Sequence, residues 1–198
     1  MTASILRFAS PDDAEAIRAI YGPYCESTTV SFEIVAPTLE QMRERIARIS
    51  ASHPWLVAEA DGKVAGYVYA TQHRERAAYR WMVDVAVYVA QDYQRRSLGR
   101  ILYKTLFSIL RHQGFFKAFA GITLPNPASQ GLHESVGFKR IGAYHGVGFK
   151  AGRWLDVGWW QLELQPEIAE PREPRPFHSI AKEPEVLAAL AAAERQMI

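Results

Sequence analysis

The stretch VYVAQDYQRRSLGRILY, residues 87–103, joins an apolar segment to a basic turn and then to a segment with helical periodicity. The apolar segment MVDVAVYVA, residues 82–90, has the composition of a buried β-strand. After the turn, apolar residues recur every three or four positions from Leu102 to Leu110, and Gly114 follows. This spacing predicts a helix that ends at Gly114, so the stretch predicts a strand, a turn and a helix in succession.

The turn itself, residues 94–100, combines positive charge with a glycine. Its place matters because the first backbone N–H groups of a helix have no partner within it, and the helix dipole adds positive potential there. Arg95 and Arg96 add charge, and Gly99 lets a phosphate approach the main chain. The turn predicts an anion site. On this stretch alone, a solvated turn capped by arginines is an equally good interpretation. Neither a Walker sequence nor a G-x-G-x-x-G sequence accompanies it.

Around this stretch the sequence predicts further strands and helices. Asp61-Gly62 lies between two apolar runs and predicts a hairpin, and Thr38 with Gln41 has the spacing of a capping box. The predicted fold class is α/β (α+β), with a central mixed sheet and helices on both faces. The other expected elements are a strand at 4–8, a helix from Ser10 to about Tyr21, a helix from Thr38, a strand at 117–124, a helix from Asn126 to near Gly137, and strands from 138 to 164.

Composition narrows the partners and the compartment. The 198 residues suffice for one domain with an appended segment, and the formal net charge of +2 is not gathered into basic blocks. We therefore expect no nucleic acid as the main partner. Cys25 is the single cysteine, which excludes an internal disulfide and a cysteine-rich zinc site, and no pattern requires a metal. No run resembles a signal peptide or a membrane span, so we expect no membrane partner and a cytoplasmic location.

The sequence changes character at Pro166. Residues 166–177, PEIAEPREPRPF, are rich in proline and charge and predict a linker or a surface arm. Residues 183–196 predict a helix without evident chemistry. We therefore expect a domain at 1–165 and a C-terminal extension at 166–198, which could clasp the domain, join a dimer or stay mobile.

Several segments together resemble a known family. VYVAQDYQRRSLGRILY resembles the acetyl-CoA-binding segment of the GNAT acetyltransferases, whose pattern is Gln/Arg-x-x-Gly-x-Gly/Ala. Gln94 and Gly99 match it, whereas Ser97 stands where the first glycine is usual. LPNPASQGLHESVGF and GVGFKAGRWLDVGWWQLEL, with TTVSFE and APTLEQM upstream, resemble the phosphinothricin-type acetyltransferases. The resemblance covers roughly residues 4–165 and implies the GNAT acyl-CoA N-acyltransferase fold.

The resemblance implies a site for acetyl-CoA as co-substrate. In the family the pantetheine arm pairs with the strand here written VAVYVA, and the pyrophosphate lies on the turn at 95–100. Asn126 matches a position that contacts the cofactor arm. The implied cofactor-binding residues are Val87, Tyr88, Val89, Gln94, Arg95, Arg96, Ser97, Leu98, Gly99, Arg100, Asn126 and Ser129.

Two residues are implied in catalysis. Asp84 interrupts an apolar strand, where a carboxylate is costly unless it is paired or hydrated, and related enzymes generally carry a glutamate base at this position. Aspartate is one methylene shorter, which favours a bridging water, and a structural carboxylate is the alternative. His133 matches a histidine of the phosphinothricin-type enzymes that could donate to the thiolate or bind the substrate head group. A structural helical histidine is the alternative.

Substrate-binding residues are implied by their positions. Arg74, Arg76 and Tyr79 lie on the loop before the catalytic strand, and arginine forks suit carboxylate or phosphinate oxygens. Phe32 and Glu33 match a mobile loop near the amino-acid pocket. The implied reaction is direct acetyl transfer, with a carboxylate general base, to the α-amine of phosphinothricin, methionine sulfoximine or methionine sulfone.

Other readings of the sequence stay open. One alternative substrate is another amine, such as an ordinary amino acid or a protein N-terminus. An acetyl-CoA-binding sensor without turnover is an alternative of another class. A family-type homodimer is expected, with the apolar strand and tryptophan surface near the C-terminus as its interface.

Overall fold

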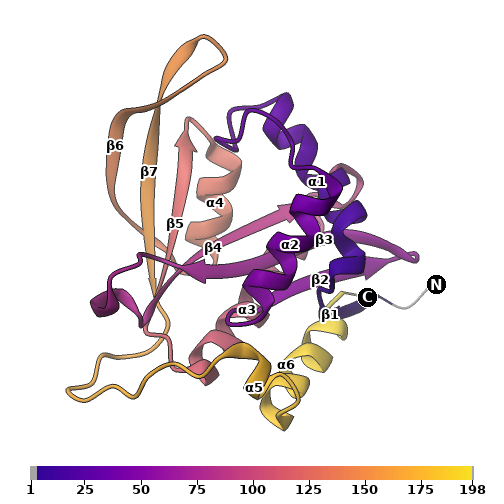
Figure 1. The fold of residues 1–198 in the computed structure, drawn as a ribbon, viewed down its shortest axis with the longest axis vertical. Helices are drawn as coiled ribbons and strands as arrows, with labels where there is room; N and C mark the ends of the chain where they lie inside the picture. Colours follow the sequence, from indigo (N-terminus) through magenta and orange to yellow (C-terminus); the bar gives the residue numbers. More distant parts are fainter. Residues whose placement is uncertain (1–3, 198) are drawn as a thin grey trace.

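The computed structural model describes residues 4–197, which form one mixed seven-stranded sheet with helices (Figure 1). The strand order is β1-β2-β3-β4-β5-β7-β6, and neighbouring strands are antiparallel except β4 and β5. The strands are β1 (Ile5–Phe8), β2 (Trp55–Ala60), β3 (Lys63–Gln72), β4 (Met82–Val89), β5 (Lys117–Leu124), β6 (Lys139–Lys150) and β7 (Arg153–Glu163). The helices are α1 (Ala14–Glu26), α2 (Leu39–Ser50), α3 (Leu98–Gln113), α4 (Pro127–Ser135), α5 (Phe177–Ile180) and α6 (Pro184–Glu194), with short 3-10 turns at Pro11–Asp13, Ala77–Tyr79 and Gln91–Tyr93.

Helices cover both faces of the sheet, which confirms the predicted architecture. On β2, Leu56 and Ala58 belong to the core that includes α3, α5 and α6. Trp55 and Val57 belong to the core that includes α1 and α2. This division follows from strand geometry, because successive side chains point to opposite faces. The sheet therefore lies between two apolar layers.

Two predictions from local sequence are confirmed. Thr38 Oγ1 accepts a hydrogen bond from Gln41 N at 3.2 Å, and Gln41 Oε1 accepts one from Thr38 N at 2.8 Å, which completes the capping box of α2. Asp61 and Gly62 both have positive φ, 54° and 71°. Positive φ at both central residues is what a two-residue hairpin turn of the favoured twist requires.

The first helix is longer than the sequence predicts. It continues past Tyr21 to Glu26 with Pro23 inside it, so the expectation of a loop from Gly22 onward is wrong as far as Glu26. The reason is packing. Tyr21 and Cys25 lie one turn apart and are both buried. Burial of this face outweighs the helical hydrogen bond that proline removes.

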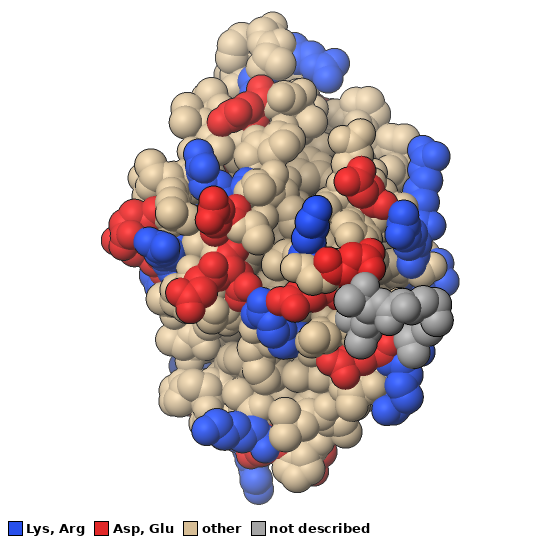
Figure 2. Space-filling model, turned by 90° about the vertical axis from the view of Figure 1, so that its right-hand side faces the viewer, with Lys and Arg blue, Asp and Glu red and all other residues tan. Residues whose placement is uncertain are grey.

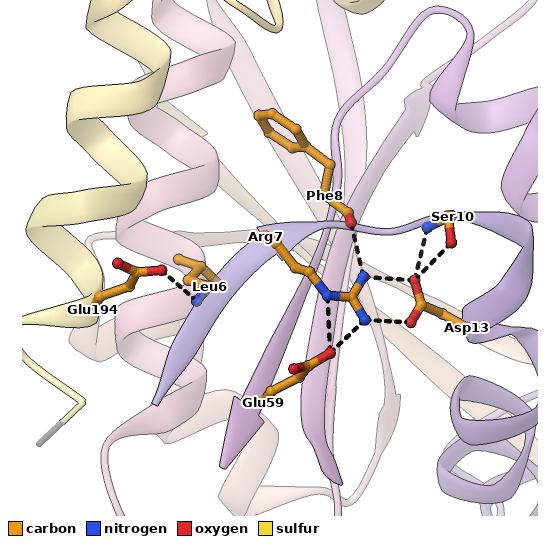
Figure 3. Close-up of polar contacts among 7 residues, drawn as sticks. All are labelled: Leu6, Arg7, Phe8, Ser10, Asp13, Glu59 and Glu194. Atoms are coloured by element: carbon orange, nitrogen blue, oxygen red, sulfur yellow. Dashed lines mark hydrogen bonds and ion pairs between the residues drawn. The ribbon is translucent and has the colours of Figure 1, made fainter. Parts of the chain in front are cut away.

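Arg7 joins β1 and β2 to the segment that leads into α1. Its guanidinium donates to both carboxylate oxygens of Asp13, at 2.8 and 2.6 Å, and to Glu59 on β2 (Figure 3). Burial alone would raise the pKa of Asp13, but hydrogen bonds from Arg7 and from the Ser10 N–H hold it below its ordinary value. Asp13 therefore stays charged and anchors the N-terminal strand.

The C-terminal extension packs on the domain, which is one of the possibilities that the sequence leaves open. Phe177 and Ile180 are buried in the same core as α3, and the Phe177 ring meets that of Phe8 edge-on at 4.8 Å. On α6, which corresponds to the predicted helix, Glu194 Oε1 accepts a hydrogen bond from Leu6 N at 3.0 Å (Figure 3). The boundary between domain and extension at residue 165 stays a prediction.

Lysine and arginine side chains are interspersed with aspartate and glutamate on the face shown in Figure 2. Within residues 4–197, no helix combines the length and apolar character needed to cross a membrane.

Candidate active site

A cavity opens where β4 and β5 part. The two strands pair only over Met82–Asp84 and Lys117–Phe119, and Asp84 faces Phe119 at the last paired position. Beyond it the strands diverge (Figure 1). In the described chain, this edge of β4 has no strand partner past Asp84, so its backbone groups are available to a ligand, except the Val89 carbonyl, which accepts a side-chain hydrogen bond. The cavity beside it has a volume of about 630 Å³.

The cavity brings together nearly all the residues that the resemblance implies for the cofactor. They come from β4, from the turn before α3 and from the first part of α4. Arg96 is the exception, because its guanidinium lies over the Tyr93 ring at 5.4 Å instead of lining the cavity. Their contact with a cofactor stays a prediction. The predicted residues that line the cavity are Val87, Tyr88, Val89, Gln94, Arg95, Ser97, Leu98, Gly99, Arg100, Asn126 and Ser129.

The turn before α3 has the geometry of an anion site. The helix begins at Leu98, so its first N–H groups have no partner within the helix. Ser97 precedes it with φ 62°, a left-handed conformation that is usual for glycine and uncommon for other residues. Gly99 lets α4 approach, because a Cβ atom there would lie 3.0 Å from Leu132 Cδ2. With Arg95 also lining the cavity, the turn suits a phosphate group.

Tyr24 also lines the cavity, although the sequence gives no sign of it. Its hydroxyl donates to Val89 O at 3.2 Å and accepts from Gln94 Nε2 at 3.2 Å, so it joins the strand to the turn. Burial raises the pKa of Tyr24, which keeps the hydroxyl neutral. Sequence reasoning misses this residue because it lies in the part of α1 that is expected to be a loop.

Asp84 forms a pair with His73, a residue that the sequence analysis does not single out. His73 Nδ1 lies 2.7 Å from Asp84 Oδ1. Burial raises the pKa of Asp84, and the hydrogen bond with His73 partly offsets this rise. The strand register explains the contact: Thr71 faces Asp84, and residue 73 follows on the same side just past the end of β3. We call Asp84 and His73 the carboxylate–imidazole pair.

The predicted substrate residues on the loop after β3 lie at different distances from this pair. Arg74 lies over the Trp159 ring at 5.6 Å, and its positive charge opposes the raised pKa of Asp84. The Tyr79 ring meets the imidazole of the pair edge-on, with centroids 5.8 Å apart. Arg76 is exposed, and its side chain makes no hydrogen bond or ion pair within residues 4–197. The structure thus brings Arg74 and Tyr79, but not Arg76, to the pair.

Phe32 and Glu33 lie on the loop between α1 and α2, and the hairpin of β6 and β7 holds this loop. Lys150, at the end of β6, donates from Nζ to the carbonyl oxygens of Cys25, Ser31 and Glu33, at 2.6, 2.6 and 2.8 Å. Hydrogen bonds from a charged donor to carbonyl oxygens are stronger than neutral ones. The loop is therefore anchored on both sides of Phe32.

Tyr69 and Arg45 connect that loop to Asp84, and sequence reasoning names neither. Arg45 donates to Glu33 Oε1 at 2.8 Å. Burial raises the pKa of Tyr69 to about 12, the charge of Arg45 opposes the rise, and those of Glu33 and Asp84 add to it. These charges all act on one hydroxyl, so the loop and the carboxylate–imidazole pair border the same region.

His133 does not line the cavity. Its Nε2 lies 2.8 Å from Tyr103 Oη, and its Nδ1 lies 2.7 Å from Ser129 O. Burial lowers the pKa of His133, and the carbonyl of Ser129 partly offsets this effect. The ring is only 5% exposed and packs edge-on against Phe138. These contacts favour the structural alternative, and a role as the acid stays a prediction.

Within residues 4–197, one group of side chains has metal-ligand spacing, and it lies at the far end of α3. His112, Glu183 and Glu185 have ligand atoms within 4.8 Å of one another. Arg175 already donates to both oxygens of Glu183, at 2.7 and 3.0 Å. Its positive charge stands where a cation would bind, so the group suits an ion pair that holds the extension better than a metal site.

The sequence and the fold have counterparts in known proteins. Residues 6–159 match the acetyltransferase (GNAT) domain. The chain is 39% identical to the phosphinothricin N-acetyltransferase of Streptomyces viridochromogenes over 177 residues, which cover 89% of this chain and 94% of that protein. It is 36% identical to the L-methionine sulfoximine/L-methionine sulfone acetyltransferase of Pseudomonas paraeruginosa over 173 residues, 86% of this chain and 100% of that one. The crystal structure of a phosphinothricin acetyltransferase from Sinorhizobium meliloti in complex with AcCoA matches with a TM-score of 0.81 and 31% identity, covering 87% of this chain and 95% of that chain.

Proposed function

This chain belongs to the GNAT acetyltransferase family, and from that premise we propose that it acetylates the α-amine of a small amino-acid analogue with acetyl-CoA as the donor. The proposed substrates are phosphinothricin, methionine sulfoximine and methionine sulfone, because two similar proteins carry these activities in their names. The observation that carries the proposal is the cavity along β4, lined by Val87, Tyr88 and Val89, on the strand whose last position paired with β5 is Asp84. An acyl donor that runs along β4 from the turn before α3 points its reactive end toward that carboxylate.

The donor binds through backbone and charge. The N-terminus of α3 holds the pyrophosphate together with Arg95 and Arg100. The open edge of β4 offers main-chain groups to the pantetheine arm, as one strand offers them to another. An N–H group of this edge polarises the thioester carbonyl and stabilises the negative charge that develops there.

Transfer is direct, from thioester to amine. Cys25 is fully buried on α1, and its thiol faces the hydroxyl of Ser31, so it is a poor nucleophile. Asp84 is the carboxylate on which removal of the amine proton depends. Its raised pKa fits a group that exchanges protons, and this shift has burial as its main cause.

The substrate head group binds near the loop after β3. Arg74 offers a guanidinium and Tyr79 a hydroxyl, and both suit the oxygens of a tetrahedral phosphorus or sulfur centre. Arg76 stays a predicted second arginine. Phe32 and Glu33 border the region from the opposite loop, which Lys150 anchors.

A thiol-release assay with purified protein tests this function. Acetyl-CoA is offered with phosphinothricin, methionine sulfoximine, methionine sulfone and each common amino acid. Turnover confined to the tetrahedral analogues supports the proposal. Turnover on ordinary amino acids would support acetyl transfer but contradict the assignment of the pocket to tetrahedral analogues. Tight acetyl-CoA binding without any turnover favours another amine substrate, such as a protein N-terminus, or the non-catalytic sensor.

A homodimer through the β6–β7 hairpin is part of the proposal. This hairpin exposes Tyr144, Val147, Phe149 and Trp154, the last with 68% of its surface accessible. Exposed apolar patches of this kind are frequent at interfaces. Sedimentation equilibrium should give a dimer for the wild type and a monomer for Trp154→Lys. A monomeric wild type would contradict the assembly and leave the chemistry untouched.

A further inference from the structure

We infer that the His73 imidazole, held by Asp84, is the group that takes the proton from the substrate amine. The inference rests on the proposed function, because it needs an amine as acyl acceptor. It assigns Asp84 the task of orienting the imidazole, in place of direct contact with the amine. Carboxylate and imidazole then share the roles that a single longer glutamate could perform alone.

The imidazole is held in one orientation by packing. It stacks on the Phe119 ring of β5, with centroids 4.3 Å apart and 17° between the planes. The Trp159 ring of β7 meets it edge-on at 6.3 Å, and the His73 side chain is only 11% exposed. A catalytic base needs such support, because proton transfer depends on a fixed distance and angle.

The two ring nitrogens of His73 have different surroundings. Nδ1 lies 2.7 Å from Asp84 Oδ1. Within residues 4–197, Nε2 makes no hydrogen bond, and it is not one of the fully buried polar atoms without a partner, so it reaches solvent. When Nδ1 carries the proton that Asp84 accepts, Nε2 carries the lone pair. A general base has this arrangement when a hydrogen bond to a neighbouring carboxylate fixes its tautomer.

The pair lies at the point where β4 and β5 stop pairing. Asp84 faces Thr71 of β3 on one side and Phe119 of β5 on the other, at the last paired position before β4 and β5 part. His73 contacts both Asp84 and Phe119, so its ring bridges this junction. An acceptor amine that reaches the thioester along the open edge of β4 therefore passes next to the imidazole.

The proton balance is complete without another reactant. Nε2 takes one proton from the substrate ammonium and releases it to water. The neutral amine attacks the thioester carbonyl, the C–N bond forms and the C–S bond breaks. Nε2 then takes the second nitrogen-bound proton and passes it to the sulfur of the leaving thiolate. One proton is released per acetyl group transferred, as the overall reaction requires.

The tautomer of His73 can be tested without any substrate. Long-range ¹H–¹⁵N correlation on protein labelled at histidine should place the hydrogen of the neutral His73 ring on Nδ1 and leave Nε2 free. His73→Gln identifies the signal by its loss. Asp84→Asn should move the hydrogen away from Nδ1. A neutral ring with its hydrogen on Nε2 has no free lone pair at Nε2 and would overturn the inference.

Chemical rescue tests the catalytic step. His73→Ala should lower kcat by about 10²- to 10⁴-fold, the usual contribution of a general base, with the KM for acetyl-CoA unchanged within about twofold. Added imidazole should restore part of kcat in proportion to its concentration, and substituted imidazoles should restore it according to their basicity. His73→Gln, which keeps a polar side chain, should lose the same rate.

His112→Ala is the matched control. Its imidazole also pairs with a carboxylate, that of Glu183, but at the opposite end of α3 from the turn. We expect its kcat to match the wild type and to be insensitive to imidazole. If His73→Ala keeps more than about a tenth of kcat, or if imidazole fails to rescue a folded His73→Ala protein, the base is not His73. A wild type that acetylates none of the amines would contradict the proposed function but not the inference about His73. The tautomer experiment tests that inference independently.

Discussion

The Phe32 ring lies against the backbone of Gly148: a Cβ atom added to this glycine would come within 2.2 Å of Phe32 Cε2. Phe32 belongs to the loop between α1 and α2, and Gly148 belongs to β6. The absence of a side chain at Gly148 thus allows the hairpin to fix the loop that we propose for the substrate.

Gly148→Ala should weaken amine binding without affecting the donor. The methyl group displaces the Phe32 ring, so we expect the KM for the amine to rise by about tenfold, the effect of roughly 1.4 kcal/mol. The KM for acetyl-CoA should stay unchanged in the same steady-state assay. Gly142→Ala is the control, because a Cβ atom there meets nothing within 4 Å. Equal effects of both variants on the amine KM would contradict the role of the Phe32 contact.

The turn before α3 should tolerate Ser97→Gly and not Gly99→Val. Glycine adopts the left-handed conformation of Ser97 without strain, so the KM for acetyl-CoA should change by less than about twofold. Valine at 99 adds bulk where even a Cβ atom alone would lie 3.0 Å from Leu132 Cδ2, and it crowds the cavity. We expect at least about a tenfold rise in the Kd of acetyl-CoA, roughly 1.4 kcal/mol, measured by calorimetry. Normal donor binding by Gly99→Val would exclude this turn as the phosphate site.

His133→Leu separates a structural role from an acid role. Both ring nitrogens are engaged inside the protein, so the substitution leaves Tyr103 Oη and Ser129 O without these partners. We expect a loss of about 1–3 kcal/mol in the free energy of unfolding, the typical result of unpaired buried groups. The kcat of the folded variant, measured at low temperature, should stay within about threefold of the wild type. A loss of about a hundredfold in kcat at unchanged stability would identify His133 as the acid.

His53 should make stability fall in mild acid. Its ring stacks on Phe115 at 5.6 Å, and burial lowers its pKa to about 4, against about 6.5 in an unfolded chain. The unfolded chain therefore takes up the proton first. The stabilising effect is complete above pH 6.5 and is lost as the pH falls toward 4. With pKa values of about 4 in the folded and about 6.5 in the unfolded protein, the loss between pH 7.5 and 5 is about 2 kcal/mol. Urea unfolding of His53→Phe should show a pH-dependent loss of stability that is smaller than that of the wild type by this amount. Parallel losses in the two proteins would refute the assignment.

Short-range patterns in the sequence predict much of the fold. The Thr38–Gln41 cap and the Asp61–Gly62 hairpin depend on residues that are neighbours in the chain, and both form as predicted. The course of α1 past Pro23 could not be predicted in this way, because it depends on packing of a buried face against α2 and the sheet.

The candidate site shows the same distinction between contacts of neighbouring residues and contacts that depend on the fold. The turn at 94–100 is contiguous, and its residues line one cavity, apart from Arg96. The contact between His73 and Asp84 depends on the register of β3 against β4, and that of Lys150 with the α1–α2 loop joins residues more than a hundred positions apart. Neither contact has a local signal in the sequence.

The hydrogen bond from the Leu6 N–H to Glu194 can form only late in the synthesis of this chain. Its partners are separated by 188 positions, and β1 is an edge strand of the sheet. While the ribosome is still adding residues, the outer edge of β1 has formed no contact with α6 and presents unpaired backbone groups to neighbouring chains. Within residues 4–197, the helix that is made last therefore shields the strand that is made first.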